Sequence, residues 1–286
     1  MMSSFWALNY PLVKIALSYD SPTVLLFFRV LFATLFSLLL FWKNIELKIS
    51  RNTALKVIVL SLFNVVLFME LWFYSENFMS APLTSVLIYT YPIISTVLSI
   101  SVLQEKVNMG IIVGIILGFT GMIIVFSYNL GVHSFTGPVI ALLAALSWSL
   151  GTLFFKKFIN NESKETVNFY QFLFALPVTF ILVMLSGQLD EVINPTLWSL
   201  FIAALIGIPG TAFAYFAFLH LNRDYSVAGV SSLLFVVPAL STIFSLIILN
   251  QSLELVGMVG LALISVGTFF SSGVLKARRG KDVQQH

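Results

Sequence analysis

The stretch Ala81–Phe126, APLTSVLIYTYPIISTVLSISVLQEKVNMGIIVGIILGFTGMIIVF, has a second copy later in the chain. Adding 146 to each residue number maps it onto residues 227–272, VAGVSSLLFVVPALSTIFSLIILNQSLELVGMVGLALISVGTFFSS. Small and proline residues keep their places in this alignment: Ser85 with Ser231, Pro92 with Pro238, Ser95 with Ser241, Thr96 with Thr242, Gly114 with Gly260 and Gly121 with Gly267. An internal repeat in so apolar a chain is typical of a membrane transporter.

Apolar residues dominate the composition. They make up 59% of the 286 residues, and charged residues make up only 9%, against about 25% in an ordinary soluble domain. The charges gather between apolar runs of roughly twenty residues, the length with which a helix crosses the hydrocarbon core. The alternating segments of about ten residues that a β-barrel needs are absent. The sequence therefore predicts an all-α integral membrane protein.

We expect ten transmembrane helices joined by short loops. The first halves of the two copies align with an offset of 142, which pairs Trp6 with Trp148 and Lys14 with Lys156. Five spans per copy is an odd number, so we expect two inverted five-helix repeats, residues 1–128 and 129–275, followed by a basic tail, 276–286. Span 1 is short at its start, and a chain start upstream of Met1 would explain this. The expected spans are 3–19, 22–42, 55–78, 82–103, 108–128, 137–158, 167–186, 196–219, 227–249 and 254–275.

Lysine and arginine gather on one side of these spans. The loops after spans 2, 4, 6 and 8 and the C-terminal tail hold 13 of the 15 basic residues, and the opposite side has only Lys14 and Arg29. By the positive-inside rule both termini are expected in the cytoplasm, in a multi-pass protein of the cell membrane. The basic tail is explained as a topological anchor, so no nucleic-acid partner is expected.

Several motifs are shared with a known family. They are Trp6 to Lys14 in the first span, Ser21 and Pro22 followed by Arg29 in span 2, Pro92 and Pro238 in spans 4 and 9, and Glu105 ahead of a glycine-rich span 5. Together they resemble the drug/metabolite transporter superfamily, specifically its EamA-type members. The resemblance implies ten helices in inverted repeats around a cavity lined mainly by helices 1, 3, 4, 6, 8 and 9, and export of amino acids, related metabolites or drugs. This sequence departs from the pattern where Gln251 replaces the second glutamate.

Three charged residues fall inside the expected spans. Placing such a charge at a helix centre costs roughly 2.5 to 3.5 kcal/mol, so it usually serves a function. Lys14, Arg29 and Glu70 are expected in one layer of the outer half of the membrane. Either Glu70 exchanges a coupling proton or binds an amine while Lys14 or Arg29 meets a substrate carboxylate, or Arg29 and Glu70 form a structural ion pair.

The two equivalent prolines, Pro92 and Pro238, lie in the middle of spans. Each removes a helical hydrogen bond, and we interpret the kinks as hinges that open the cavity, with passive kinks as the alternative. Polar and aromatic residues on the lining helices are further candidates for substrate binding, with ordinary packing as the alternative. They are Trp6, Asn9, Tyr10, Asn64, Tyr74, Tyr89, Trp148, Thr152, Tyr215 and Ser231.

Several kinds of chemistry find no support in the sequence. There is no cysteine, the three histidines are scattered, and no phosphate-binding G-x-x-x-x-G-K-[ST] motif or grouped nucleophile and base occurs. We therefore expect no enzyme, no cofactor and no metal site. The glycines of spans 5 and 10 are expected to pack helices together within a monomer, with a homodimer interface as the alternative.

The sequence predicts a secondary transporter that moves a small organic solute across the bilayer by alternating access, in the export direction. An amino acid or similar zwitterion would suit paired opposite charges. One alternative is a facilitative exchanger or uniporter without proton coupling. The other is a membrane scaffold that transports nothing.

Overall fold

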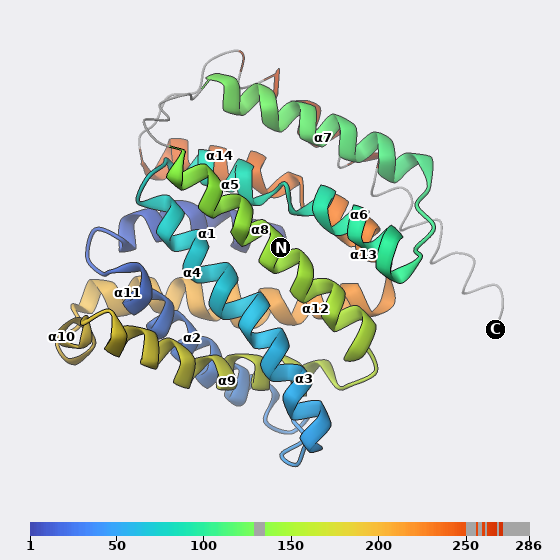
Figure 1. Cartoon of the computed structure of the whole chain (residues 1–286). Coiled ribbons are helices and arrows are strands. Elements are labelled where there is room, and N and C mark those ends of the chain that lie inside the picture. The colour runs from blue at the N-terminus through green and yellow to red at the C-terminus, as the bar shows by residue number, and fades with distance from the viewer. Residues whose placement is uncertain (129–134, 250–255, 257–258, 261, 268, 271–286) are drawn as a thin grey trace.

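A computed structural model gives the structure of the chain, and it describes residues 1–128, 135–249, 256, 259–260, 262–267 and 269–270. The regular structure within these ranges is helical (Figure 1). Seven helices there are long and apolar enough to cross a membrane, and a shorter apolar helix covers Met109–Ile124. The chain is thus an all-helical, multi-pass membrane protein. The basic tail and Gln251 lie outside the described residues.

Helices in the first part of the chain begin where the sequence supplies a cap. Pro22 starts the second helix, where its missing N–H is not needed. The hydroxyls of Ser50 and Ser80 accept hydrogen bonds from the backbone N–H groups of the first turns that follow them. The helices are α1 (Met2–Ala16), α2 (Pro22–Phe41), α3 (Arg51–Ser61), α4 (Phe68–Glu76), α5 (Ala81–Ile88), α6 (Tyr91–Leu103) and α7 (Met109–Tyr128).

The second part of the chain repeats this order and adds a short helix, α10, in the loop after α9. Ser163, Thr196 and Ser226 cap the helices that follow them. Helical residues at 256, 259–260, 262–267 and 269–270 fall in the last expected span. The helices are α8 (Thr136–Phe158), α9 (Lys164–Leu185), α10 (Leu189–Ile193), α11 (Leu197–Gly207), α12 (Ala214–Asp224), α13 (Val227–Leu233) and α14 (Val236–Ile248).

Two spans contain wide π-helical turns, and two others are broken. The turns are η1 (Leu62–Leu67), which joins α3 to α4, and η2 (Ile208–Phe213), which joins α11 to α12; they lie 146 residues apart. The breaks precede Pro92 and Pro238, and each proline falls in the first turn of the helix after the break. The expected kinks are therefore interruptions of the helix just before each proline, and their role as hinges stays a prediction.

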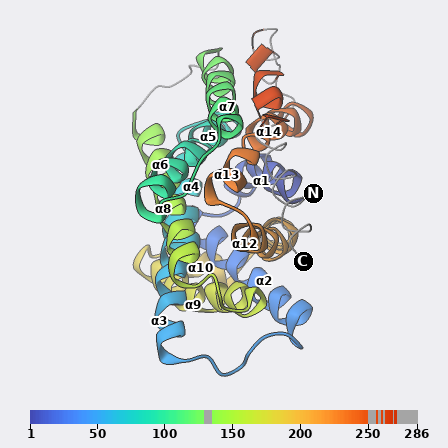
Figure 2. The ribbon, with the colours of Figure 1, turned by 90° about the vertical axis from the view of Figure 1, so that its right-hand side faces the viewer.

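Helices from the two parts of the chain pack alternately against one another. α2 packs against α9 and α11, α1 packs against α14, and α8 contacts both α4 and α6. Figure 1 shows α7 along one edge of the bundle and α9 near the opposite edge, and the view turned by 90° in Figure 2 gives the same order. The buried core is therefore shared between the two parts.

Glycines allow α7 to approach the helical residues near the end of the chain. A Cβ atom added to Gly121 would lie 2.6 Å from the carbonyl oxygen of Gly260, and one added to Gly267 would lie 2.7 Å from that of Gly114. Both contacts are to backbone, which cannot turn away as a flexible side chain would. The expected packing role of these glycines within one chain is confirmed.

Candidate functional site

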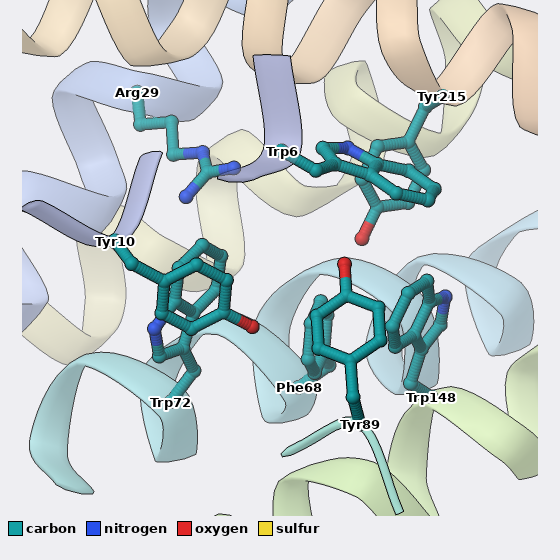
Figure 3. Close-up of a pocket in the computed structure, with 8 residues that line it drawn as sticks. All are labelled: Trp6, Tyr10, Arg29, Phe68, Trp72, Tyr89, Trp148 and Tyr215. Atoms are coloured by element: carbon teal, nitrogen blue, oxygen red, sulfur yellow. The ribbon is translucent and has the colours of Figure 1, made fainter. Parts of the chain in front are cut away.

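A small aromatic cavity lies enclosed between helices of both parts of the chain. Its volume is only about 10 Å³, far below the roughly 300 to 1,000 Å³ of pockets that hold drug-sized ligands. Its walls come from α1, α2, α4, α8, α12 and the break between α5 and α6. The lining residues are Trp6, Tyr10, Arg29, Phe68, Trp72, Tyr89, Trp148 and Tyr215 (Figure 3).

Ring contacts hold the walls of this cavity. Trp148 stacks on Tyr91 with ring centroids 4.0 Å apart and on Phe68 with centroids 4.9 Å apart. The ring of Trp6 meets that of Trp148 nearly at a right angle, 5.3 Å away. These are favourable geometries for aromatic pairs. Because the rings fill most of the centre, a solute of appreciable size enters only if they move apart.

The two wide turns supply backbone acceptors to the cavity walls. The hydroxyl of Tyr215 donates to the Asn64 carbonyl in η1 at 3.0 Å, and the indole N–H of Trp6 donates to the Gly210 carbonyl in η2 at 3.1 Å. Wide turns of this kind are frequent at functional sites. Sequence reasoning did not foresee them, although Asn64 within an apolar span and the run Ile208–Gly210 are signals for an irregular turn.

Five of the residues expected to bind substrate line the cavity: Trp6, Tyr10, Tyr89, Trp148 and Tyr215. Figure 3 shows the hydroxyl groups of the three tyrosines turned toward the enclosed space. The cavity thus combines apolar ring faces with several groups that can form hydrogen bonds. Ring faces and hydroxyls together are typical of sites that hold small organic molecules.

Arg29 also lines the cavity, although helix 2 is not among the main lining helices that the resemblance implies. Its Nε donates to the hydroxyl of Thr211 at 2.6 Å, and its guanidinium lies 5.0 Å from the centre of the Trp72 ring. Glu70 instead accepts from the hydroxyl of Thr23 at 2.5 Å. Among the described residues the two charges form no ion pair, because their side chains are held by different partners.

Lys14 is likewise occupied outside the cavity, contrary to its expected role at a substrate carboxylate. Its ammonium donates to the backbone carbonyls of Glu76 and, at 2.9 Å, of Met79, and so caps the C-terminal end of α4. The aligned Lys156 donates to the Asn222 carbonyl at the end of α12 at 2.7 Å. A lysine cation is favourable where helical carbonyls are left without partners.

The two asparagines expected in the lining pack against glycines across the interface between the two parts. A Cβ added to Gly210 would lie 2.2 Å from the amide of Asn9, which is turned so that its nitrogen donates to the Phe5 carbonyl at 3.3 Å and its oxygen faces Arg29. A Cβ added to Gly151 would lie 2.1 Å from Oδ1 of Asn64, so only glycine fits beside this amide. Both asparagines are buried next to the cavity but are absent from its lining.

The remaining expected residues also lie off the cavity wall. Tyr74 is 47% exposed on the outside of α4. Thr152 accepts from the hydroxyl of Tyr91 at 3.3 Å, and Ser231 donates to the same hydroxyl at 3.2 Å and accepts from Ser95 at 2.9 Å. These hydroxyls form a buried network behind Trp148, which Tyr91 stacks on.

Sequence reasoning missed a row of side chains on α4. Phe68 and Trp72 line the cavity, and the buried carboxylate of Glu76 accepts from the indole N–H of Trp72 at 2.7 Å. The other oxygen of Glu76 has no hydrogen-bond partner among the described residues. The spacing of four residues places Phe68, Trp72 and Glu76 on one face of the helix. This spacing is the feature of the sequence that could have identified them.

The part of the chain that the structure describes holds no group of three or more histidine, aspartate or glutamate residues that could bind a metal ion. The described site therefore offers aromatic faces, hydroxyls, a guanidinium and one neighbouring carboxyl group.

Known proteins with similar sequences are transporters. The sequence profile of the EamA-like transporter family matches residues 1–127 and 135–273. The chain is 28% identical over 263 residues to "Uncharacterized transporter YvbV" of Bacillus subtilis (strain 168), with 91% of this chain and 85% of that protein covered. It is 25% identical over 281 residues to "Uncharacterized transporter YoaV" of the same organism, with 96% and 95% covered. A crystal structure at 15% identity has the same fold, with a TM-score of 0.75 over 97% of this chain and 96% of the other.

Proposed function

Because this chain belongs to the EamA-like transporter family, whose members are transporters and not enzymes, we propose that it moves a small organic solute across the cell membrane by alternating access. The aromatic cavity is the place where the solute binds. The closed cavity between the two parts of the chain carries this proposal. It is walled by groups suited to an organic molecule, and it needs a rearrangement of helices to admit one.

Repeated features support the proposal that residues 1–128 and 129–275 form two inverted five-helix repeats. The wide turns η1 and η2 lie 146 residues apart, as do Tyr89 and Phe235 in the two helix breaks. Contacts repeat as well, since α1 packs on α14 as α8 packs on α6, and α4 packs on α8 as α12 packs on α1. Two repeats related by a two-fold axis in the membrane plane are expected to make such equivalent contacts with each other. In alternating access the repeats rock about this axis.

The two ends of the bundle differ in a way that suits alternating access. At the end where α1 finishes, Lys14 binds carbonyls after α4, Ser199 donates to Asp20, and Glu191 accepts from the backbone N–H of Ser21 at 2.8 Å. These last two contacts join the two parts of the chain. At the other end an open polar hollow is lined by Gln104, Glu105, Lys106, Lys156, Asp224, Tyr225 and Ser226.

Basic residues at the end with the hollow support the proposed orientation of the protein. Lys106 and Lys156 lie at the end with the open hollow, and positive charge favours the cytoplasmic side. We place both termini and the hollow in the cytoplasm, and export is the direction in keeping with a site that is filled from there. The solute is an amino acid, a related metabolite or a drug-like molecule.

Glu76 replaces Glu70 as the group proposed to exchange a coupling proton. Glu70 is held by Thr23, whereas Glu76 is fully buried and bonded to Trp72 of the cavity wall. Lys14 from α1 and Arg29 from α2 act on its charge, and its charge in turn acts on Tyr10 of α1. A proton gained or lost at Glu76 would change a hydrogen bond that positions the wall of the solute site.

Counterflow in proteoliposomes tests the proposed function. Vesicles loaded with a mixed pool of amino acids and metabolites are exposed to labelled members of the pool, and exchange is read by mass spectrometry. We expect one class of solute to exchange, and accumulation when a pH gradient is imposed. Exchange that ignores the gradient would identify a facilitative exchanger, and the absence of exchange for every solute would contradict transport and favour a scaffold.

A further inference from the structure

Arg29 is a buried charge that forms no ion pair among the described residues. Its side chain is 1% exposed, and Nε donates to Thr211 at 2.6 Å. The guanidinium lies over the rings of Trp72 and Phe73, with its carbon 5.0 and 5.3 Å from their centres. Nη1 has no hydrogen-bond partner among the described residues. A buried charged donor without a partner is costly, so its retention in a cavity wall needs a reason.

Neighbouring groups bind Nε and Nη2 of the guanidinium but leave Nη1 without a partner. With its amide turned so that the oxygen faces Arg29, Asn9 accepts from Nη2 at 3.1 Å. Glu76 acts on Arg29 through its charge, yet its carboxylate is bonded to Trp72. No carboxylate of the described residues lies within ion-pair distance of Arg29. Figure 3 shows the guanidinium above the ring of Tyr10, with one terminal nitrogen turned toward Tyr10 and the other toward Trp6.

The stacking and the hydrogen bond at Nε fix the plane of this guanidinium. A planar, fixed guanidinium matches the two oxygens of a carboxylate, which a lysine ammonium does not. Around it, the rings of Tyr10 and Trp72 lie 4.6 Å apart by their centroids, and the hydroxyls of Tyr89 and Tyr215 point into the same space (Figure 3). The cavity therefore offers one anion-binding point beside apolar ring faces.

We propose that Arg29 binds the carboxylate of the transported solute through Nη1, while the aromatic walls hold a flat apolar body next to it. This assignment rests on the transport function proposed above and adds a substrate class, a carboxylate joined to an apolar group. It gives Arg29 the role that sequence reasoning divided between Arg29 and Lys14. A neutral amide or a cationic amine of the same shape would lack the contact to the guanidinium.

Binding of matched probes to the purified full-length protein tests this assignment. The probes are phenylacetate, phenylacetamide and phenethylamine, which differ in the group that would face Arg29. Quenching of tryptophan fluorescence reports binding, because Trp6, Trp72 and Trp148 line the cavity. We expect phenylacetate to bind the wild-type protein about ten- to a hundredfold more tightly than the other two, the range for a charge-assisted hydrogen bond in a buried site.

Variants of Arg29 complete the test. Arg29→Gln is expected to lose this preference for the acid while binding phenylacetamide as the wild type does, and Arg29→Lys to retain part of it. Arg223→Gln makes the same exchange at an exposed position and is expected to keep the wild-type preference. If Arg29→Gln does not fold, the comparison of the three probes on the wild-type protein still decides.

Two outcomes overturn the assignment. One is equal binding of acid, amide and amine to the wild type, and the other is an unchanged preference for the acid in a folded Arg29→Gln variant. If counterflow finds a transported solute that carries no carboxylate, transport stands and the role of Arg29 fails. If no solute exchanges at all, the proposed function fails with it.

Discussion

Replacing Glu76 by glutamine tests how the cavity is coupled to a proton gradient. The amide of Glu76→Gln keeps an oxygen that accepts from the indole N–H of Trp72, which is 2.7 Å from the carboxylate in the wild type. The substitution removes the charge and the titrating proton but preserves the size of the side chain. We therefore expect a folded protein in which Trp72 keeps its place and the solute still exchanges.

The size of the expected solute accumulation follows from the single carboxyl group of Glu76. One titrating group exchanges one proton per solute, and one pH unit corresponds to about 1.36 kcal/mol. With the membrane potential held at zero, a gradient of one unit therefore supports accumulation of the solute up to about tenfold. In Glu76→Gln the same gradient is expected to give no accumulation, while counterflow without a gradient continues.

The assay compares proteoliposomes of the wild type, Glu76→Gln and Glu70→Gln under the same imposed gradient. Glu70→Gln is the matched control, since Glu70 is bonded to Thr23 and does not line the cavity. We expect it to accumulate solute as the wild type does. Accumulation in Glu76→Gln equal to that of the wild type, or its loss only in Glu70→Gln, would refute the assignment of the coupling proton to Glu76.

Two further predictions concern stability. Gly267→Ala places a Cβ 2.7 Å from the Gly114 carbonyl, and overpacking of this kind costs about 1 to 3 kcal/mol of stability. Thermal unfolding of this variant in detergent should therefore occur at a lower temperature than that of the wild type. An unchanged unfolding temperature would contradict the backbone contact. Burial raises the pKa of Asp20, in the loop before α2, above its ordinary value of 3.8, and the charge of Glu191 adds to this although the Ser199 hydroxyl lowers it. The folded state then holds this proton more tightly than the unfolded chain, so Asp20 lowers stability as the pH rises above about 4. The unfolding temperature of Asp20→Asn relative to the wild type should rise between pH 4 and 7, and a constant difference would refute the shift.

Hydropathy and loop length were enough to predict the helical membrane fold and most helix bounds. The expected span 137–158 agrees with α8 to within one residue, for example, because a run of apolar residues bounded by a glycine and lysines has one stable arrangement in a bilayer. The wide turns η1 and η2 could not be predicted in this way. They depend on contacts from other helices, such as Tyr215 on the Asn64 carbonyl.

The sequence predicted the site residues whose place depends on the type of side chain. It failed for residues whose place depends on the direction in which the side chain points. Trp6 and Trp148 were found because large aromatic residues at equivalent places in two copies point to a shared centre. Lys14 was misplaced because a lysine near a helix end extends its ammonium along its long stem, here to the carbonyls after α4. Arg29 and Glu70 are at similar depths, but depth along a helix does not tell which neighbour a side chain faces.

Alternating access is the central claim, and a pair of equivalent serines tests it. Ser80 caps α5 and Ser226 caps α13. They lie at opposite ends of the bundle, since Glu105, just after α6, accepts from the N–H of Val227 at 2.9 Å and so lies beside Ser226. The chain has no cysteine, so Ser80→Cys and Ser226→Cys each carry a single reactive thiol.

The measurement is the rate at which a membrane-impermeant thiol reagent labels each variant in detergent, with and without the solute identified by counterflow. Alternating access predicts that the solute changes the two rates in opposite directions, because one end closes as the other opens. Rates that do not respond to the solute, or that change in the same direction at both ends, would contradict the account.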